Sequence, residues 1–417
     1  MTVGAPAASS RFHNIVRALG NRNYRIYATG NFISLCGTWL QRIAVGWLAW
    51  QLTHSAAWLG LVSFADLFPT VILSPIAGTL ADRRDRVAMI RSTQFLAMGQ
   101  AITLAAMTYA DLMTIGWLFV LSLAMGIVNA FNQPARLALI PSLVDRPDLA
   151  SAVALNSTIF NSARFLGPAA AGFLIAHGSV ALAFAVNAAS YTVFYAALLR
   201  IKLTDLPPTG ARRRNFLEDS LEGYGYVARH AGIGPMMVLL TATALCTRGF
   251  TELLPGFADA VFGRGAQGLA WLTATTGLGA MVGGVLMASR GEPAGLTRLV
   301  IANLLVMSLA LIAFTATTSY WLALACLFVA GFSLVVNGIG AQTLIQTAVD
   351  SAMRGRVMSL YGMIFRGGPA LGTLIMGSAA SQVGLRLPVA TGALLCAGFW
   401  LWARLRQNRI AASFEGS

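Results

Sequence analysis

Apolar runs of about 20 residues alternate with short polar bends along the whole chain. A bilayer core about 30 Å thick needs roughly 20 apolar residues in a helix that rises 1.5 Å per residue. The pattern therefore predicts an all-α membrane protein with twelve transmembrane helices, and an even number places both termini on one side. We expect these helices near residues 25–50, 57–80, 88–109, 113–133, 150–176, 180–200, 234–262, 268–289, 296–317, 319–344, 355–383 and 387–405.

Polar intervals divide the chain into two six-helix bundles. The longest interval between helices carries "LPPTGARRRNFLEDSLEGYGYVARH". Its second part is read either as an amphipathic helix on the inner membrane face or as a solvated linker, since it contains two glycines. The expected order is a cytoplasmic leader 1–24, a bundle 25–200, a cytoplasmic linker 201–233, a bundle 234–405 and a cytoplasmic tail 406–417.

Basic residues set the predicted orientation. Short loops rich in Lys and Arg stay on the cytoplasmic side, and only Arg264 and Arg386 fall on the other side. We therefore expect a multi-pass protein of the inner membrane with both termini in the cytoplasm. The cytoplasmic set is Arg11, Arg17, Arg22, Arg25, Arg83, Arg84, Arg86, Arg136, Arg146, Lys202, Arg212, Arg213, Arg214, Arg290, Arg354, Arg356, Arg404, Arg406 and Arg409.

Composition agrees with a membrane protein and excludes several other classes. The chain is 57% hydrophobic and only 11% charged, far from the averages of soluble domains. The net charge of +14 is accounted for by topology, because no basic groove with interleaved aromatics indicates nucleic acid. Four cysteines lie singly in apolar runs, so neither a metal site nor a disulfide framework is predicted. No nucleophile triad or phosphate-binding loop indicates an enzyme.

Six ionisable residues lie inside the predicted helices and are the candidates for substrate and proton binding. Each charge at a helix centre costs about 2.5–3.5 kcal/mol or more on insertion scales, so it is expected to face a partner or a wet cavity. The excess of two positive charges predicts an anionic substrate. The six are Arg42, Asp66, Arg164, Arg248, Glu252 and Arg366.

Spacing suggests pairs among these six residues. Arg42 and Asp66 lie roughly 12–14 Å below the outer surface on neighbouring helices and are placed to pair. Arg248 and Glu252 are four residues apart, which brings them to one helix face. Arg164 and Arg366 occupy equivalent places in the two bundles. Static interior salt bridges are the alternative interpretation, whereas a transport role makes Asp66 and Glu252 the proton carriers.

Other polar residues inside the helices leave two interpretations open. Asn156, Asn161, Asn187 and Asn337 are read either as substrate contacts or as interhelical hydrogen bonds. Near the first outer turn, Trp39, Trp47, Trp50 and Trp58 predict an interfacial belt, with Trp39 deep enough to reach a cavity.

The two halves repeat one pattern, which is typical of secondary transporters. "GTLADRRDR" is similar to the loop signature of the major facilitator superfamily, G-x-L-A-D-R-x-G-R, with Asp85 at the second glycine. "ARFLGPAAAG" resembles the exporter motif of its helix 5 through Gly167, Pro168 and Gly172. The chain thus resembles the enterobactin-exporter-like branch of twelve-helix exporters. The R-x-x-x-G signature of drug exporters is missing, since no arginine precedes Arg136 in helix 4.

The resemblance implies a conformational latch at Gly78, Asp82, Arg83 and Arg86. Asp82 is expected to cap the cytoplasmic start of helix 11 when the inner gate is closed, and the arginines to pair with acids on neighbouring helices. Simple topology signals are the alternative for these arginines.

The resemblance also implies a function. We expect a monomer without a cofactor that works as a secondary active transporter. It exports a siderophore-like or other anionic or polar metabolite by alternating access and is driven by protons. Its partners are then a small-molecule substrate and membrane lipid. A multidrug efflux transporter, a lysolipid flippase and a non-transporting receptor or assembly factor are the alternatives.

Overall fold

The computed structural model describes residues 17–83, 85–201, 216–290 and 295–415, and gives the backbone alone at residues 74, 75, 79, 81–83, 216–221 and 415. A helix lies at each of the twelve predicted spans. In a bilayer, a helix satisfies its backbone hydrogen bonds within itself, which is why the apolar runs adopt this form.

The first half contains six long helices. A short 3-10 turn, η1 (Arg17–Gly20), leads into them. They are α2 (Arg22–Thr53), α3 (Ala56–Arg83), α4 (Arg86–Tyr109), α5 (Ile115–Leu139), α6 (Leu149–His177) and α7 (Val180–Leu199), with 3-10 turns η2 (Ile140–Ser142) and η3 (Arg146–Asp148) before α6.

The second half repeats this order, but its first span is broken. The prediction of one continuous helix over 234–262 is wrong, because α9 ends at Cys246 and α10 begins at Phe250. The Thr247 hydroxyl donates to the Thr243 carbonyl at 2.7 Å, a bond that competes with the regular helix pattern. The elements are α9 (Ile233–Cys246), α10 (Phe250–Gly256), the π-helical η4 (Phe257–Val261), α11 (Gly265–Ser289), α12 (Leu296–Ala316), α13 (Tyr320–Ala348), α14 (Arg354–Val383) and α15 (Arg386–Leu405).

Two shorter helices lie beside the second half at the end away from α10. They are α8 (Phe216–Arg229), in the linker, and α16 (Gln407–Glu415), in the tail. Gly223 of α8 packs on Arg356, where an added Cβ would approach the Arg356 Cβ to 3.1 Å. Arg356 also pairs with Glu222 at 3.0 Å. The linker helix is therefore fixed to the start of α14.

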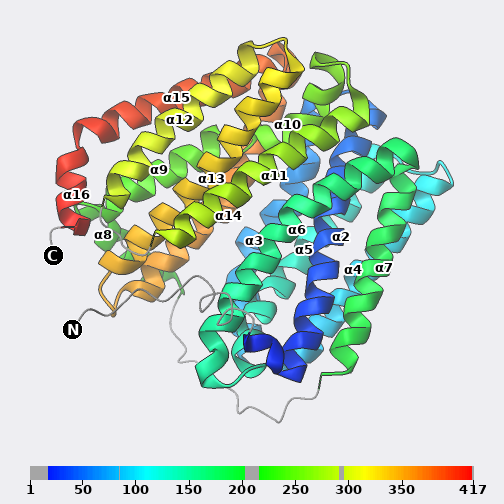
Figure 1. The fold of residues 1–417 in the computed structure, drawn as a ribbon, viewed down its shortest axis with the longest axis horizontal. Helices are drawn as coiled ribbons and strands as arrows, with labels where there is room; N and C mark the ends of the chain where they lie inside the picture. Colours follow the sequence, from blue (N-terminus) through cyan, green and yellow to red (C-terminus); the bar gives the residue numbers. More distant parts are fainter. Residues whose placement is uncertain (1–16, 84, 202–215, 291–294, 416–417) are drawn as a thin grey trace.

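The two halves meet along two helix pairs that are distant in sequence. α3 packs along α14, and α6 packs along α11. Figure 1 shows the halves converging near α10 and diverging toward the end where α8 and α16 lie. Glycines permit this convergence: a Cβ on Gly60 would lie 2.7 Å from the Thr373 carbonyl oxygen, and Gly172 packs directly on Ala270.

The hydrophobic core is shared at one end of the molecule and divided at the other. Near α10, one cluster joins residues of both halves, among them Leu40 and Leu59 with Phe257 and Leu272. Toward the termini, the first half has its own core around Phe194 and Leu139, and the second half has another around Ile301 and Ile345. The structure is thus closed at the α10 end, which we call the outer end.

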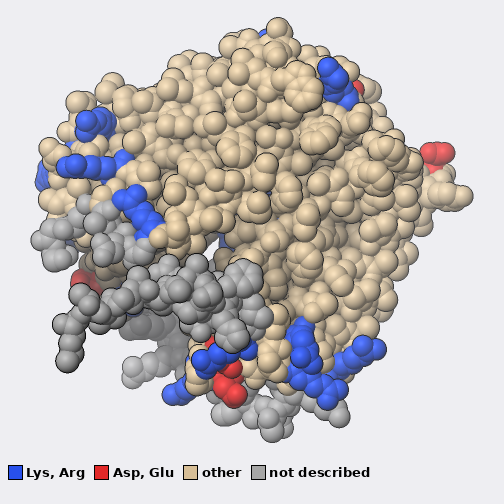
Figure 2. Space-filling view, viewed as in Figure 1, with Lys and Arg blue, Asp and Glu red and all other residues tan. Residues whose placement is uncertain are grey.

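Apolar side chains cover the outside of both bundles. Figure 2 shows a face that is almost entirely uncharged, with charged groups gathered toward its margins. Large exposed apolar side chains include Ile72, Phe173 and Ile375, each more than half exposed. Among the described residues, nine segments are long and apolar enough to cross a membrane. This surface suits a lipid environment, because lipid tails are as apolar as the side chains that face them.

Candidate functional site

Arg42 is held between two carboxylates that come from different halves of the protein. Its Nη2 lies 2.6 Å from Glu252 Oε1 of α10, and its Nη1 lies 3.6 Å from Asp66 Oδ2 of α3. The side chains of Arg42, Asp66 and Glu252 are 29%, 25% and 18% exposed, so water reaches all three. This group, which we call the bridge, directly links the two halves next to the closed outer end.

Both carboxylate oxygens of Glu252 have partners. Ser63, one turn before Asp66 on α3, donates from its hydroxyl to Glu252 Oε2 at 3.2 Å. The Thr251 hydroxyl lies 3.5 Å from Oε1. Hydrogen bonds to an ionised carboxylate are stronger than those between neutral groups. The Glu252 carboxylate is therefore held by a guanidinium from α2 and by hydroxyls from α3 and α10.

Close helix packing fixes the position of Asp66. Gly126 of α5 lies against the backbone of α3, where a Cβ would come within 2.5 Å of the Asp66 carbonyl oxygen and 2.7 Å of the Ala65 carbonyl oxygen. Any larger residue at this position would push α3 away from α5. The glycine thus sets the distance between Asp66 and the helices behind it.

Arg164 lies beside the bridge but has no ion-pair partner among the described residues. Its guanidinium carbon lies 5.6 Å from the ring centroid of Trp39, and that of Arg42 lies 5.8 Å from the same ring. Phe160 packs edge-on against Trp39, with ring centroids 6.0 Å apart. A cation–π contact contributes about 0.5–2 kcal/mol, so it holds Arg164 without neutralising its charge.

Arg248 does not pair with Glu252, contrary to the spacing-based prediction. It lies in the break between α9 and α10, where the regular i, i+4 geometry is lost. Its Nη1 donates instead to the Phe365 carbonyl at 3.4 Å, and its guanidinium lies 4.3 Å from the Phe365 ring centroid. Glu252 pairs with Arg42 instead. Arg248 therefore keeps its charge without an acidic partner in the described part of the chain.

Arg366 and Arg164 lie on corresponding helices, α14 and α6, and the structure does not bring them together in any described contact. Arg366 is half-buried and follows Phe365, which packs on Arg248. The six interior residues therefore separate into the bridge, with Arg42, Asp66 and Glu252, and three further arginines.

Part of the predicted latch lies outside the described residues. The side chains of Asp82 and Arg83 are not described, so their predicted contacts with helix 11 stay predictions. An added Cβ on Gly78 would meet no atom within 4 Å. Arg86 donates to the Ala138 carbonyl at 3.1 Å and to the Ser142 hydroxyl at 3.3 Å, both within the first half.

The helix 5 motif lies at two close contacts. An added Cβ on Gly167 would lie 2.5 Å from Trp39 Cβ and 2.8 Å from the Cys36 carbonyl oxygen. Gly167 and Pro168 are buried between helices, while Gly172 faces Ala270 of the other half. Gly167 thus allows α6 to approach α2, and Gly172 allows the halves to approach each other.

Arg136 is an interior residue, although it was predicted to lie in a cytoplasmic loop. The helix predicted to end at residue 133 runs to Leu139 through Pro134. Arg136 donates to Asn31 Oδ1 at 2.6 Å and to Gln94 Oε1 at 3.0 Å, and lies 4.7 Å from the Phe194 ring centroid. Membrane helices tolerate proline, so α5 continues past Pro134. The amide side chains of Asn31 and Gln94, which lie inside other predicted helices, were the sequence signal for an interior polar partner.

Trp50 is a second residue whose role the sequence did not indicate. It was expected in an interfacial belt, but it is 5% exposed, and its indole Nε1 donates to Asp259 Oδ2 at 2.8 Å. Asp259 belongs to the π-helical η4 of the second half. This hydrogen bond joins the two halves at the outer end, above the bridge.

Metal-binding side chains do not converge in the described part of the chain. No group of three His, Cys, Asp or Glu residues there has the geometry to hold a metal ion. The bridge consists of one guanidinium and two carboxylates, and the Ser63 and Thr251 hydroxyls lie beside it. Such groups can bind an anion or move a proton.

Comparisons with known proteins agree with this arrangement. The sequence matches the family of transmembrane secretion effectors over residues 16–413. The staphyloferrin A transporter of Staphylococcus aureus is 24% identical over 370 residues, which cover 87% of this chain and 90% of that protein. The enterobactin exporter EntS of Shigella boydii is 26% identical over 383 residues, which cover 91% and 89%.

A solved structure has the same fold. A bacterial homologue of the human lysosomal transporter Spinster, inward-facing and unoccupied, has a TM-score of 0.73 at 16% identity, with 94% of this chain and 98% of that chain covered. The predicted fold of two pseudo-symmetric six-helix bundles is confirmed. Because the family match spans nearly the whole sequence, the chain belongs to the transmembrane secretion effector family and is a multi-pass secondary transporter of the major facilitator superfamily.

Proposed function

We propose that this transporter exports siderophore-like organic anions in exchange for protons. Two relatives along most of the chain are named a staphyloferrin A transporter and an enterobactin exporter. We extend the substrates in these two names to a class of substrates for this chain, namely polar molecules that carry carboxylate or other acidic oxygens.

The single observation that carries the proposal is the bridge. Arg42 is shared by carboxylates of both halves, at 2.6 Å and 3.6 Å, and Arg164 and Arg248 nearby have no acidic partner among the described residues. Guanidinium groups recognise carboxylates through paired donors. Surplus positive charge in a partly dehydrated site attracts anions and repels cations. An acidic substrate fits this site better than a cationic drug.

The bridge also supplies a means of proton coupling. In the form described here, Arg42 pairs with Glu252 at 2.6 Å. When the outer ends separate, Arg42 and Glu252 move apart with their helices, and a carboxylate that loses its cation binds a proton more readily. Closure returns Arg42 and releases the proton to the opposite side. The proton then moves inward in each cycle in which the substrate moves outward.

We further propose that both termini are cytoplasmic, which makes the described form inward-facing. Basic residues at the terminal end support this orientation, among them Arg17, Arg25 and Arg146, all exposed. We also propose that the protein acts as a monomer surrounded by lipid. Exposed apolar side chains on helices of both halves support that arrangement.

Transport into inside-out membrane vesicles tests the function. Respiration acidifies the vesicle lumen, and potassium with valinomycin removes the membrane potential. We expect labelled iron-free staphyloferrin A or enterobactin to accumulate in the lumen and to leave when a protonophore is added. Accumulation of ethidium in place of both acids would contradict an anion exporter and favour multidrug efflux. Accumulation that resists the protonophore would contradict proton exchange.

A further inference from the structure

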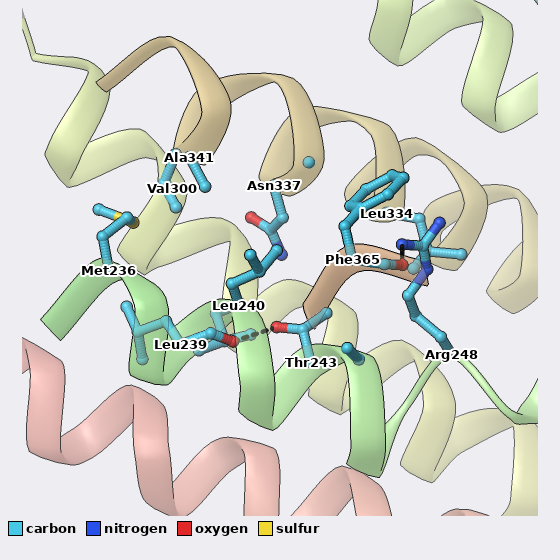
Figure 3. A pocket seen from close by; sticks show the side chains of 13 residues that line it. Met236, Leu239, Leu240, Thr243, Arg248, Val300, Leu334, Asn337, Ala341 and Phe365 are labelled. Carbon is cyan, nitrogen blue, oxygen red and sulfur yellow. Dashed lines mark hydrogen bonds between the residues drawn. The ribbon is translucent and has the colours of Figure 1, made fainter. Parts of the chain in front are cut away.

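A cavity lies within the second half and reaches Arg248 at one end. It is enclosed by α9, α12, α13 and α14, with Met236 and Leu240 on one wall and Leu334 and Ala341 on another. Its free volume is about 20 Å³, close to the space that one water or one methyl-sized group requires. Figure 3 shows the lining side chains in a row that runs from Met236 to Arg248. The proposed proton exchange does not use this cavity.

A buried polar donor without a partner faces this apolar cavity. Asn337 is 7% exposed, and its Oδ1 accepts a hydrogen bond from Asn303 Nδ2 at 2.9 Å. Asn303 Oδ1 in turn accepts from the Ser333 hydroxyl at 3.1 Å. These bonds fix the orientation of the Asn337 amide, and its Nδ2 has no acceptor among the described residues.

The orientation of Asn337 matters because a buried donor is costly to leave unpaired. Figure 3 shows the side chain extending from α13 toward Leu240 of α9. An incoming carbonyl oxygen would supply the missing acceptor. The alternative acceptor is a single bound water.

Arg248 lies at one end of the same row. Its guanidinium has five N–H donors, and among the described residues one of them is used, in a long bond of 3.4 Å to the Phe365 carbonyl. The cavity thus offers a cation at one end, a neutral N–H donor further along and aliphatic walls around it. A carboxylate followed by a carbonyl and a short apolar group complements this order.

We propose that this cavity is a substrate subsite for carboxylate-bearing molecules that carry a neutral carbonyl and a short apolar group. Arg248 binds the carboxylate, Asn337 Nδ2 donates to the carbonyl, and the apolar group lies among Met236, Leu240 and Ala341. The proposal rests on the proposed transport of organic anions and narrows the substrate class. Because the free volume of about 20 Å³ holds only one small group, the ligand enters as the flexible Met236 and Leu240 side chains move aside.

Two small probes isolate the contribution of the carbonyl. N-Butanoylglycine has a carboxylate, an amide carbonyl and a three-carbon end, and heptanoate has the same length without the amide. Binding of each to the full-length protein in lipid nanodiscs is titrated by saturation-transfer NMR. We expect N-butanoylglycine to bind about tenfold more tightly than heptanoate, the discrimination typical of one good buried hydrogen bond.

A matched pair of variants tests Asn337 itself. N337L removes the Nδ2 donor, and Asn303 keeps its bonds to Ser333. The control is N132L, because Asn132 is also 7% exposed and lies on α5, the corresponding helix of the first half. We expect N337L to abolish the preference for N-butanoylglycine and N132L to preserve it. A341L, which fills the cavity, is expected to weaken both probes about tenfold.

Equal binding of the two probes to the unsubstituted protein would overturn the subsite, as would equal effects of N337L and N132L. A bound water that stays on Asn337 in the presence of saturating probe would overturn it too. These titrations require no transport. Loss of proton-driven export with intact Asn337-dependent binding would therefore refute the proposed function alone, and the reverse result would refute the subsite alone.

Discussion

Arg136 in the first half and Arg248 in the second half are both interior arginines without acidic partners among the described residues, yet their surroundings differ. Arg136 lies within a continuous helix and donates to two amide oxygens, at 2.6 Å and 3.0 Å. Arg248 lies in a helix break and makes one bond of 3.4 Å. Each also faces a phenylalanine ring. A guanidinium whose donors are used stabilises its bundle, whereas one with free donors is available to a ligand.

The largest expected effect follows from removing Arg136. R136M leaves the Asn31 and Gln94 side-chain oxygens without their charged donor, and each buried acceptor without a partner costs about 1–3 kcal/mol. We expect the free energy of unfolding in detergent to fall by about 3 kcal/mol. The control R25M changes an exposed arginine of α2 and is expected to have little effect. Equal stability of R136M and R25M would remove the distinction between the two arginines.

Arg248 is expected to give the opposite result. R248Q removes one weak hydrogen bond and a cation–π contact, so the unfolding free energy should change by less than about 1 kcal/mol. Substrate affinity should fall about tenfold or more, because a carboxylate loses its cation. Unfolding and binding are measured on the same preparation. A large loss of stability with unchanged affinity would place Arg248 among the structural residues.

Most of the fold could be predicted from the sequence, because the length of an apolar run is a local property. The proximity of Arg42 and Asp66 could be expected from their depth, whereas Glu252 was expected beside Arg248. The Arg42–Glu252 contact could not, since it joins residues 210 positions apart and depends on how the halves lean together. The break before α10 likewise depends on the surroundings of Thr247 and Arg248.

Arg136 shows a different limit of the sequence pattern. The predicted helix ended at residue 133, and a basic residue just beyond an apolar run normally marks a cytoplasmic loop. The buried partners Asn31 and Gln94 come from two other helices. Only their convergence identifies Arg136 as an interior residue.

The smallest expected effect concerns the ion pair between Glu222 and Arg356 at the surface, which gives a baseline for the interior arginines. Glu222 of α8 is 60% exposed where it meets Arg356, and surface ion pairs contribute about 0–1 kcal/mol. E222Q should therefore change the unfolding free energy by about 0.5 kcal/mol or less, and high salt should remove the difference. Denaturation at two salt concentrations measures it. A change as large as that in R136M would show that solvent exposure does not set the contribution of these arginines.

The central claim is that the two carboxylates around Arg42 couple transport to protons. The most direct measurement is accumulation of labelled substrate in acidified inside-out vesicles that contain the double variant D66N/E252Q, compared with the unsubstituted protein. We predict that the variant lets substrate equilibrate across the membrane but no longer concentrates it, because neither amide binds and releases a proton. Concentration of substrate to the level reached by the unsubstituted protein would contradict the account.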